Sequence, residues 1–160
     1  MNQKETPTGN HQKKLINPAG TEVIYDSMQF SQAVQVGSMI WVSGQVGMNE
    51  KFEMAEGIEA QTRQAFINLK RVINEAGGSL EDIVELVTYH ISMSDMRKFA
   101  KVKSEFFSNN YPAWTANGIN ELILPGLFVE IRATAVINNV NNCGGIAILH
   151  GSRLNITDDL

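Results

Sequence analysis

The sequence has one cysteine, no long apolar run and no cluster of lysine or arginine residues. Cys143 alone cannot form an internal disulfide, which favours a reducing compartment. No apolar run reaches the ~20 residues of a membrane span, and the polar start of the chain lacks the apolar core of a signal peptide. The net charge of −4 argues against nucleic-acid binding, which depends on a basic face. We therefore expect a cytoplasmic protein that binds neither nucleic acid nor membrane.

The remaining composition describes one globular domain with a tail at each end. The chain has 160 residues, of which 43% are apolar and 19% are charged, enough for a single sizeable core. Residues 1–13 are polar and aperiodic, and we expect them to form a flexible lead-in. From residue 138 the composition becomes rich in asparagine and glycine, so residues 138–160 are interpreted as a tail without an assigned fold. The folded domain is therefore placed at residues 14–137.

The first part of the domain has the pattern of three strands and a helix. A short edge strand is expected at residues 14–17, and a β-hairpin at residues 30–36 and 39–43. Residues 58–76 carry apolar side chains at spacings of three and four, which is the pattern of an amphipathic helix. Gly77-Gly78 should end this helix, because glycine readily adopts the left-handed conformation of a helix C-terminus.

The second part adds a strand, a helix and two more strands. Residues 83–91 are apolar on both faces, as in a covered central strand. Asp95 is the predicted N-cap of a helix whose apolar stripe extends to Phe107. Strands at residues 111–115 and 127–136 complete the chain. The order β-β-β-α-β-α-β-β predicts an α+β fold with two helices packed on one face of a mixed sheet.

The second face of such a sheet has no helix to cover it. We place Trp41, Ala133, Ala135 and the second face of strand 83–91 there. An apolar patch of that size is unusual on a soluble monomer. Oligomerisation through the open sheet face is therefore expected.

A carboxylate stands inside the last apolar strand. Glu130 lies between Val129 and Ile131, and burying its charge is unfavourable unless the group is paired or neutral. By strand alternation it shares a face with Arg132, at roughly 7 Å. One interpretation is a structural ion pair between Glu130 and Arg132 on a half-exposed face. The other is a general acid/base, or a carboxylate that orients water, in a pocket.

Three further positions are weaker candidates. Ser43-Gly44-Gln45 stands where an apolar strand turns polar, and exposed backbone N–H groups at a strand end can hold an anion or a carbonyl oxygen. His90 has no second histidine, cysteine or carboxylate at ligand spacing, so we interpret it as structural and predict no metal site. Lys103 lies on the apolar stripe of the second helix, where it either extends outward to solvent or points into a site.

Several stretches in combination resemble the RidA/YjgF family of small enamine/imine deaminases. They follow the family's order over about residues 14–137, and they are Phe30–Gly37, Val42–Val46, Gln61–Leu69, Tyr111–Ala113 and Val129–Val136. The resemblance implies a chorismate-mutase-like fold and a homotrimer with three sites in clefts between neighbouring subunits. It also implies hydrolysis of a reactive enamine or imine to a ketone and ammonia, without a metal or organic cofactor.

Residue by residue, the resemblance covers part of the family's site. Glu130 matches the family glutamate that positions or activates water. Ser43 and Gly44 match the residues at a strand end that contact the substrate. Phe30 stands where well-studied members have a tyrosine, so a hydroxyl is missing.

Three other positions depart from the family pattern. Trp114 stands where the archetypal deaminases have the arginine that binds the substrate's carboxylate, Ala116 replaces a cysteine, and Lys103 stands where an asparagine often lies. Losing a hydrogen bond to a charged group costs roughly 1.5–3 kcal/mol. We therefore expect 2-aminoacrylate to be handled poorly, and a larger, flatter or less acidic imine, enamine or keto acid to be favoured.

Two functions remain open from the sequence. In the first, the protein is a deaminase of altered specificity, in which Glu130 orients water and Trp114 stacks on the substrate. In the second, a trimer of the same fold binds a metabolite or partner without chemistry. Ribonuclease activity, attributed to some relatives, fits poorly with the acidic net charge and the lack of paired histidines or a basic groove.

Overall fold

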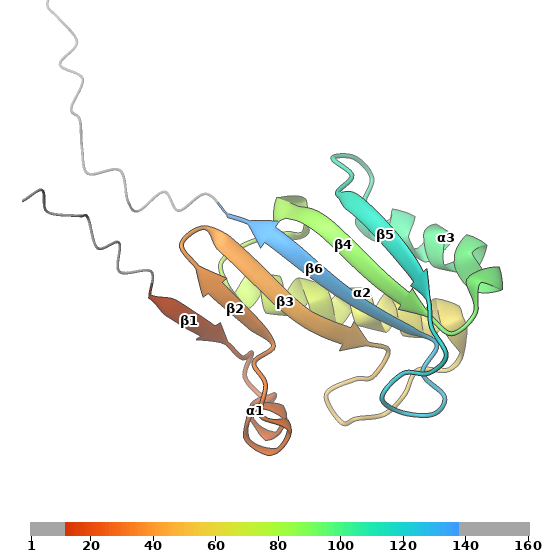
Figure 1. The fold of residues 1–160 in the computed structure, drawn as a ribbon, viewed down its shortest axis with the longest axis horizontal. Helices are drawn as coiled ribbons and strands as arrows, with labels where there is room; N and C mark the ends of the chain where they lie inside the picture. Colours follow the sequence, from red (N-terminus) through yellow and green to blue (C-terminus); the bar gives the residue numbers. More distant parts are fainter. Residues whose placement is uncertain (1–11, 138–160) are drawn as a thin grey trace, which may run out of the picture.

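The computed structural model describes residues 12–137 and has the predicted α+β architecture (Figure 1). Its strands are β1 (Lys13–Ile16), β2 (Ala33–Val36), β3 (Met39–Val46), β4 (Ile83–His90), β5 (Ala113–Gly118) and β6 (Val129–Val136). Its α-helices are α1 (Glu22–Met28), α2 (Gly57–Glu75) and α3 (Met96–Phe106). The predicted order of strands and long helices is confirmed, with α1 added between β1 and β2. The predicted tail at 138–160 and most of the lead-in lie outside the described residues.

The six strands form one mixed sheet in the order β1-β2-β3-β6-β4-β5. Only β4 and β5 run parallel, and the other neighbouring strands are antiparallel. Helices α2 and α3 lie together against one face of the sheet (Figure 1). The last strand of the domain, β6, is therefore a central strand between β3 and β4, so residues near its start are flanked by a strand on each side.

The core lies between α2, α3 and the sheet. Phe66 and Leu69 of α2 are fully buried in one apolar cluster with Ala133 and Ala135 of β6. The prediction that these two alanines lie on the open sheet face was wrong: they share the helix-covered face with Val129, where small side chains let α2 approach closely. Trp41 does lie on the open face and is 42% exposed.

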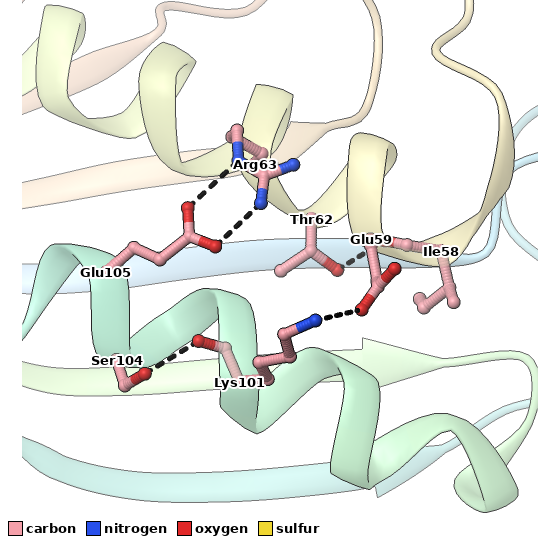
Figure 2. Close-up of polar contacts among 7 residues, drawn as sticks. All are labelled: Ile58, Glu59, Thr62, Arg63, Lys101, Ser104 and Glu105. Carbon is pink, nitrogen blue, oxygen red and sulfur yellow. Dashed lines mark hydrogen bonds and ion pairs between the residues drawn. The ribbon is translucent and has the colours of Figure 1, made fainter.

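Helices α2 and α3 are joined by ring packing inside and by ion pairs outside. The Phe66 ring stacks on that of Phe106 at 4.9 Å between centroids. At the surface, Arg63 donates two hydrogen bonds to Glu105, at 2.6 and 2.9 Å, and Lys101 reaches Glu59 at 3.3 Å (Figure 2). All four charged side chains are well exposed, so each pair contributes about 0–1 kcal/mol, and the rings dominate the helix contact.

The segment between β1 and β2 departs from the sequence expectation. Helix α1 has seven residues, none of them buried, so no apolar period predicted it. It ends at Gln29, whose φ of 57° is left-handed. Phe30 follows directly and is not part of a strand, because β2 begins only at Ala33. The predicted strand at residues 30–36 was therefore three residues too long at its start.

Candidate functional site

A cleft of about 630 Å³ opens beside Glu130 at one end of the sheet. Glu130 lies near the start of β6, opposite Val46 of β3 and Tyr89 of β4. Alternation turns its side chain away from the face that carries the core residues Val129 and Ile131. The volume is within the range of about 300–1,000 Å³ typical of small-molecule sites. The predicted site residues Phe30, Ser43 and Gly44 line the same cleft.

The Glu130 carboxylate has no charge partner in the described chain. Arg132, the predicted ion-pair partner, instead approaches Glu85 at 3.9 Å. Within residues 12–137, the Glu130 carboxylate makes no hydrogen bond and no ion pair. Burial raises the pKa of Glu130 above its ordinary value, because desolvation disfavours the charged form. A carboxylate of this kind can take up and release a proton closer to neutral pH than an exposed one.

Gly44 makes room for this carboxylate. A Cβ atom at position 44 would lie 2.1 Å from the Glu130 Oε1 atom and 2.5 Å from its carboxyl carbon. The pairing of β3 with β6 shifts register between Val42 and Gln45, so Gly44 lies in a bulge within the strand. The interpretation of Ser43-Gly44-Gln45 as a strand end was wrong, because β3 continues to Val46.

Side-chain hydrogen bonds fix the bulge to the segment that carries Phe30. The Ser43 hydroxyl donates to the Ser31 carbonyl at 2.8 Å, and the Ser43 N–H donates to the Gln32 carbonyl at 2.9 Å. The buried Gln45 amide donates to the Gln32 side-chain oxygen at 3.1 Å. Phe30 and Glu130 are therefore held on one rigid frame, and the Ser43 oxygen keeps capacity to accept a hydrogen bond from a ligand.

Gln61 of α2 holds the chain that leads into Glu130, and sequence reasoning missed it. Its amide donates to the carbonyls of Gly126 at 2.8 Å and Ala55 at 3.1 Å, and its oxygen accepts from the Phe128 N–H at 2.8 Å. The side chain is 1% exposed. The available signal in the sequence was a polar residue beside the apolar stripe of a helix. This signal does not distinguish a buried residue that binds the backbone of a loop from a residue exposed to solvent.

Replacing Gln61 with leucine should lower the free energy of unfolding by about 2–3 kcal/mol, because three backbone groups lose their partner. Chemical denaturation measures this loss. The same change at Gln64, one turn away with a single side-chain bond to Asn68, should cost well under half as much. Equal losses for the two variants would show that Gln61 does not clamp the loop.

The other predicted site residues lie elsewhere. Trp114 of β5 pairs in register with the buried Leu86, and its ring stacks on Phe99 of α3 at 5.6 Å. The Lys103 ammonium lies 4.7 Å from the Trp114 ring centroid, and partial burial lowers the pKa of this lysine. Ala116 follows Trp114 by two positions on the same strand face. Trp114 and Ala116 lie on the sheet face that the helices cover, and Lys103 lies on α3 itself, whereas Glu130 faces away from the helices.

One chain therefore does not unite the two groups of residues. Glu130 of β6 is opposite Tyr89 of β4, which is in turn opposite Asn117 of β5. Trp114 lies three residues before Asn117 in β5. This register separates the backbones of Glu130 and Trp114 by about 10 Å across the sheet and about 10 Å along it. Neither Trp114, Ala116 nor Lys103 lines the cleft beside Glu130. Within residues 12–137 of one chain, the two groups of residues therefore do not form a single site.

His90 is fully buried between the sheet and Phe99. Its Nε2 lies 2.8 Å from the Thr88 hydroxyl oxygen, which also accepts a hydrogen bond from the Trp114 indole at 3.0 Å. Burial lowers the pKa of His90, which favours the neutral ring. Among residues 12–137, no three histidine, cysteine, aspartate or glutamate residues are grouped as metal ligands, and no helix is long and apolar enough to cross a membrane.

Comparison with known proteins gives consistent matches. A family model described as endoribonuclease L-PSP matches residues 21–137. A 2-iminobutanoate/2-iminopropanoate deaminase of Dermatophagoides farinae is 37% identical over 110 residues, covering 68% of this chain and 85% of that protein. The RutC family protein YjgH of Escherichia coli is 33% identical over 128 residues, covering 79% and 96%.

Solved structures share the fold. RidA from an Antarctic Psychrobacter bacterium superimposes with a TM-score of 0.65 at 37% identity, covering 68% of this chain and 88% of that one. The structure of protein YjgH gives a TM-score of 0.71 at 33% identity, covering 78% and 96%. The likeness covers 88% and 96% of the lengths of these two proteins.

Proposed function

Because the chain belongs to the RidA/YjgF family, we propose that it hydrolyses a reactive enamine or imine to a ketone and ammonia. The observation that carries the proposal is Glu130, a carboxylate of raised pKa that lines a small-molecule cleft without a cation beside it. The name of the deaminase relative supports the reaction class. No metal or organic cofactor is required by this chemistry.

Glu130 acts in this mechanism first as a base and then as an acid. It accepts a proton from water as the oxygen attacks the imine carbon, which gives a carbinolamine. Starting from the protonated imine, it then returns this proton to nitrogen, and the C–N bond breaks so that ammonia leaves with the bonding electron pair. Glu130 takes the hydroxyl proton as that oxygen becomes the ketone oxygen, and the released ammonia removes this proton as ammonium. The raised pKa suits both steps, because a carboxylate that protonates only at low pH is a weak base.

The complete site is proposed to lie between two subunits of a homotrimer in the cytoplasm. Phe30, Ser43, Gly44 and Glu130 supply one wall, and Lys103, Trp114 and Ala116 of a neighbouring chain supply the other. The separation of the two groups within one chain supports this arrangement. The exposed apolar side chains of the open sheet face, Met39, Trp41 and Val136 among them, provide a surface for assembly. Trp114 would exclude the bidentate carboxylate contact of an arginine, so 2-aminoacrylate is not the favoured substrate.

A homotrimer that binds a metabolite or partner without chemistry is the second candidate. It is favoured by the missing hydroxyl at Phe30 and by Trp114 at the position of the family's arginine, because both changes remove polar groups that would contact a substrate. Among the described residues that line the cleft in one chain, Glu130 is the one ionisable group. Ammonia release from imines generated in situ by an amino-acid oxidase separates the two functions. Turnover supports the deaminase, whereas a thermal shift with ligand and no ammonia supports the binding protein.

Two inactive variants should restore activity to each other if the site is shared. Glu130→Gln removes the proposed base, and Trp114→Ala removes the ring that a neighbouring chain is proposed to supply. Trimers that contain only one of these variants should therefore be poor catalysts. In randomly mixed trimers, about a quarter of the sites combine an intact Glu130 with an intact Trp114. Ammonia release by the co-refolded mixture measures this, with light scattering to verify the trimer mass. A stable monomer, or a mixture no better than its components, would contradict a shared site.

A further inference from the structure

The cleft beside Glu130 is bounded by apolar side chains from three separate segments. Helix α1 supplies Ile24 and Met28, the turn after β3 supplies Phe52, and the loop before β6 supplies Ile123 and Leu124. Figure 1 shows these segments gathered at the same end of the sheet. We call these five residues the apolar wall. Several are unusually exposed for their size, with Ile123 at 67% and Phe52 at 50%.

The turn that carries Phe52 is rigid and strained. Asn49 accepts hydrogen bonds from the N–H groups of Lys51 at 2.9 Å and Glu53 at 3.0 Å, and its amide donates to the Glu53 carboxylate at 2.7 Å. Phe52 has a φ of 61°, a left-handed conformation that is unfavourable for a bulky side chain. The turn thus holds an aromatic ring at the cleft in spite of an unfavourable backbone conformation at Phe52. Backbone strain of this kind is concentrated at functional sites.

The loop that carries Ile123 and Leu124 is also anchored. Leu127 is buried, and the Gln61 side chain fixes the backbone of Gly126 and Phe128. With the end of the loop tied down, Ile123 and Leu124 are presented outward and do not enter the core. The exposure of these two side chains therefore results from how the loop is held.

The charge distribution of the cleft identifies the kind of ligand. Among the described residues that line the cleft, Glu130 is the only ionisable one, and the other polar side chains are one serine and four amides. A protonated imine is complementary to the carboxylate, and an apolar substituent is complementary to the wall. Within residues 12–137 of one chain, the lining supplies no cation beside the apolar wall, and the Lys103 proposed to come from a neighbouring chain belongs to the opposite side of the site.

We propose that the apolar wall selects imines with a bulky branched or aromatic side chain over those with a methyl group. This substrate class rests on the proposed deaminase function, but binding can be measured without turnover. The imine carbon lies at Glu130, and the side chain lies against Met28, Phe52 and Leu124, where it removes their apolar surface from water.

The binding test uses unreactive keto acids as probes in isothermal titration calorimetry. The protein should bind 4-methyl-2-oxopentanoate at least roughly tenfold more tightly than pyruvate, as a few added methyl groups in an apolar pocket can provide. The variant Ile123→Ala/Leu124→Ala should lose most of this ratio. Ile67→Ala, the same substitution at an exposed isoleucine on α2 away from the cleft, should keep it.

Ammonia release from the imines of leucine and alanine is measured on the same three proteins. The same preference in turnover is the expected result. Equal affinity for the two keto acids in the unmodified protein overturns the proposal. So does an Ile123→Ala/Leu124→Ala variant that loses its assembled mass while keeping the ratio, because the wall is then a contact between subunits. A retained binding preference without any ammonia release leaves the wall in place and removes the deaminase function.

Discussion

Replacing Glu130 with glutamine should reduce ammonia release from imines at least roughly 100-fold while leaving the unfolding transition nearly unchanged. A positioned general base contributes about 10²–10⁴-fold, and glutamine keeps the shape of the side chain but cannot accept the proton. Stability should be preserved because the carboxylate makes no ion pair or hydrogen bond within residues 12–137. Because desolvation disfavours the charged form of the Glu130 carboxyl group and raises its pKa, replacing it with a neutral amide should stabilise the fold slightly.

The pH dependence supplies a second measurement on the same residue. Because the folded-state pKa of Glu130 is raised, its deprotonated form is lost as pH falls through that raised value, and kcat/KM should fall there, at a higher pH than for an exposed glutamate. Glu121→Gln, an exposed carboxylate in the loop before β6, is the matched control and should leave the profile unchanged. Full activity in Glu130→Gln would exclude Glu130 as the base.

Replacing Gly44 with alanine should reduce activity by roughly 100-fold through Glu130. The added Cβ would fall 2.1 Å from the Oε1 atom, so the carboxylate must move from its position over the bulge. A displacement of about 1 Å at a catalytic group can cost 10²-fold. Steady-state kinetics measures the loss, and circular dichroism verifies that the fold persists.

A double-mutant cycle separates this effect from general damage to β3. In the Glu130→Gln background, Gly44→Ala should lower activity no further, because the group through which it acts has already lost its function. Its effect on the free energy of unfolding should be the same in both backgrounds, since glutamine occupies the same space. Additive losses of activity would mean that Gly44 contributes independently of Glu130.

The sequence predicted the framework because its signals are local. Residues 58–76 and the stripe ending at Phe107 have helical spacing, and α2 and α3 form where expected. The alternation around Glu130 correctly put Val129 and Ile131 on one face of the strand and the carboxylate on the other, but it did not identify which face the helices cover. The resemblance in motif order identified the family, which the comparisons confirm.

The features that shape the site have no such local signal. Helix α1 buries none of its residues and therefore has no apolar period. The bulge at Gly44 results from the pairing of β3 with β6, where the residue beside Gly44 is Glu130, 86 positions later in the chain. A single glycine in the sequence does not predict such a bulge. Gln61 holds the loop before β6 through bonds that span 65 and 67 residues.

By itself, the sequence determined the order of the six strands and two long helices, the apolar stripes of α2 and α3, and the presence of a carboxylate in an apolar strand, because periodicity and burial energy act along the chain. Tertiary structure alone decided which side chains meet. It placed β6 between β3 and β4, gave Glu130 a cleft with Phe30 and Gly44, and put Trp114 and Lys103 on the opposite face. Strand order, register and the closing of loops over a cleft depend on contacts between residues far apart in the chain, so no local pattern encodes them.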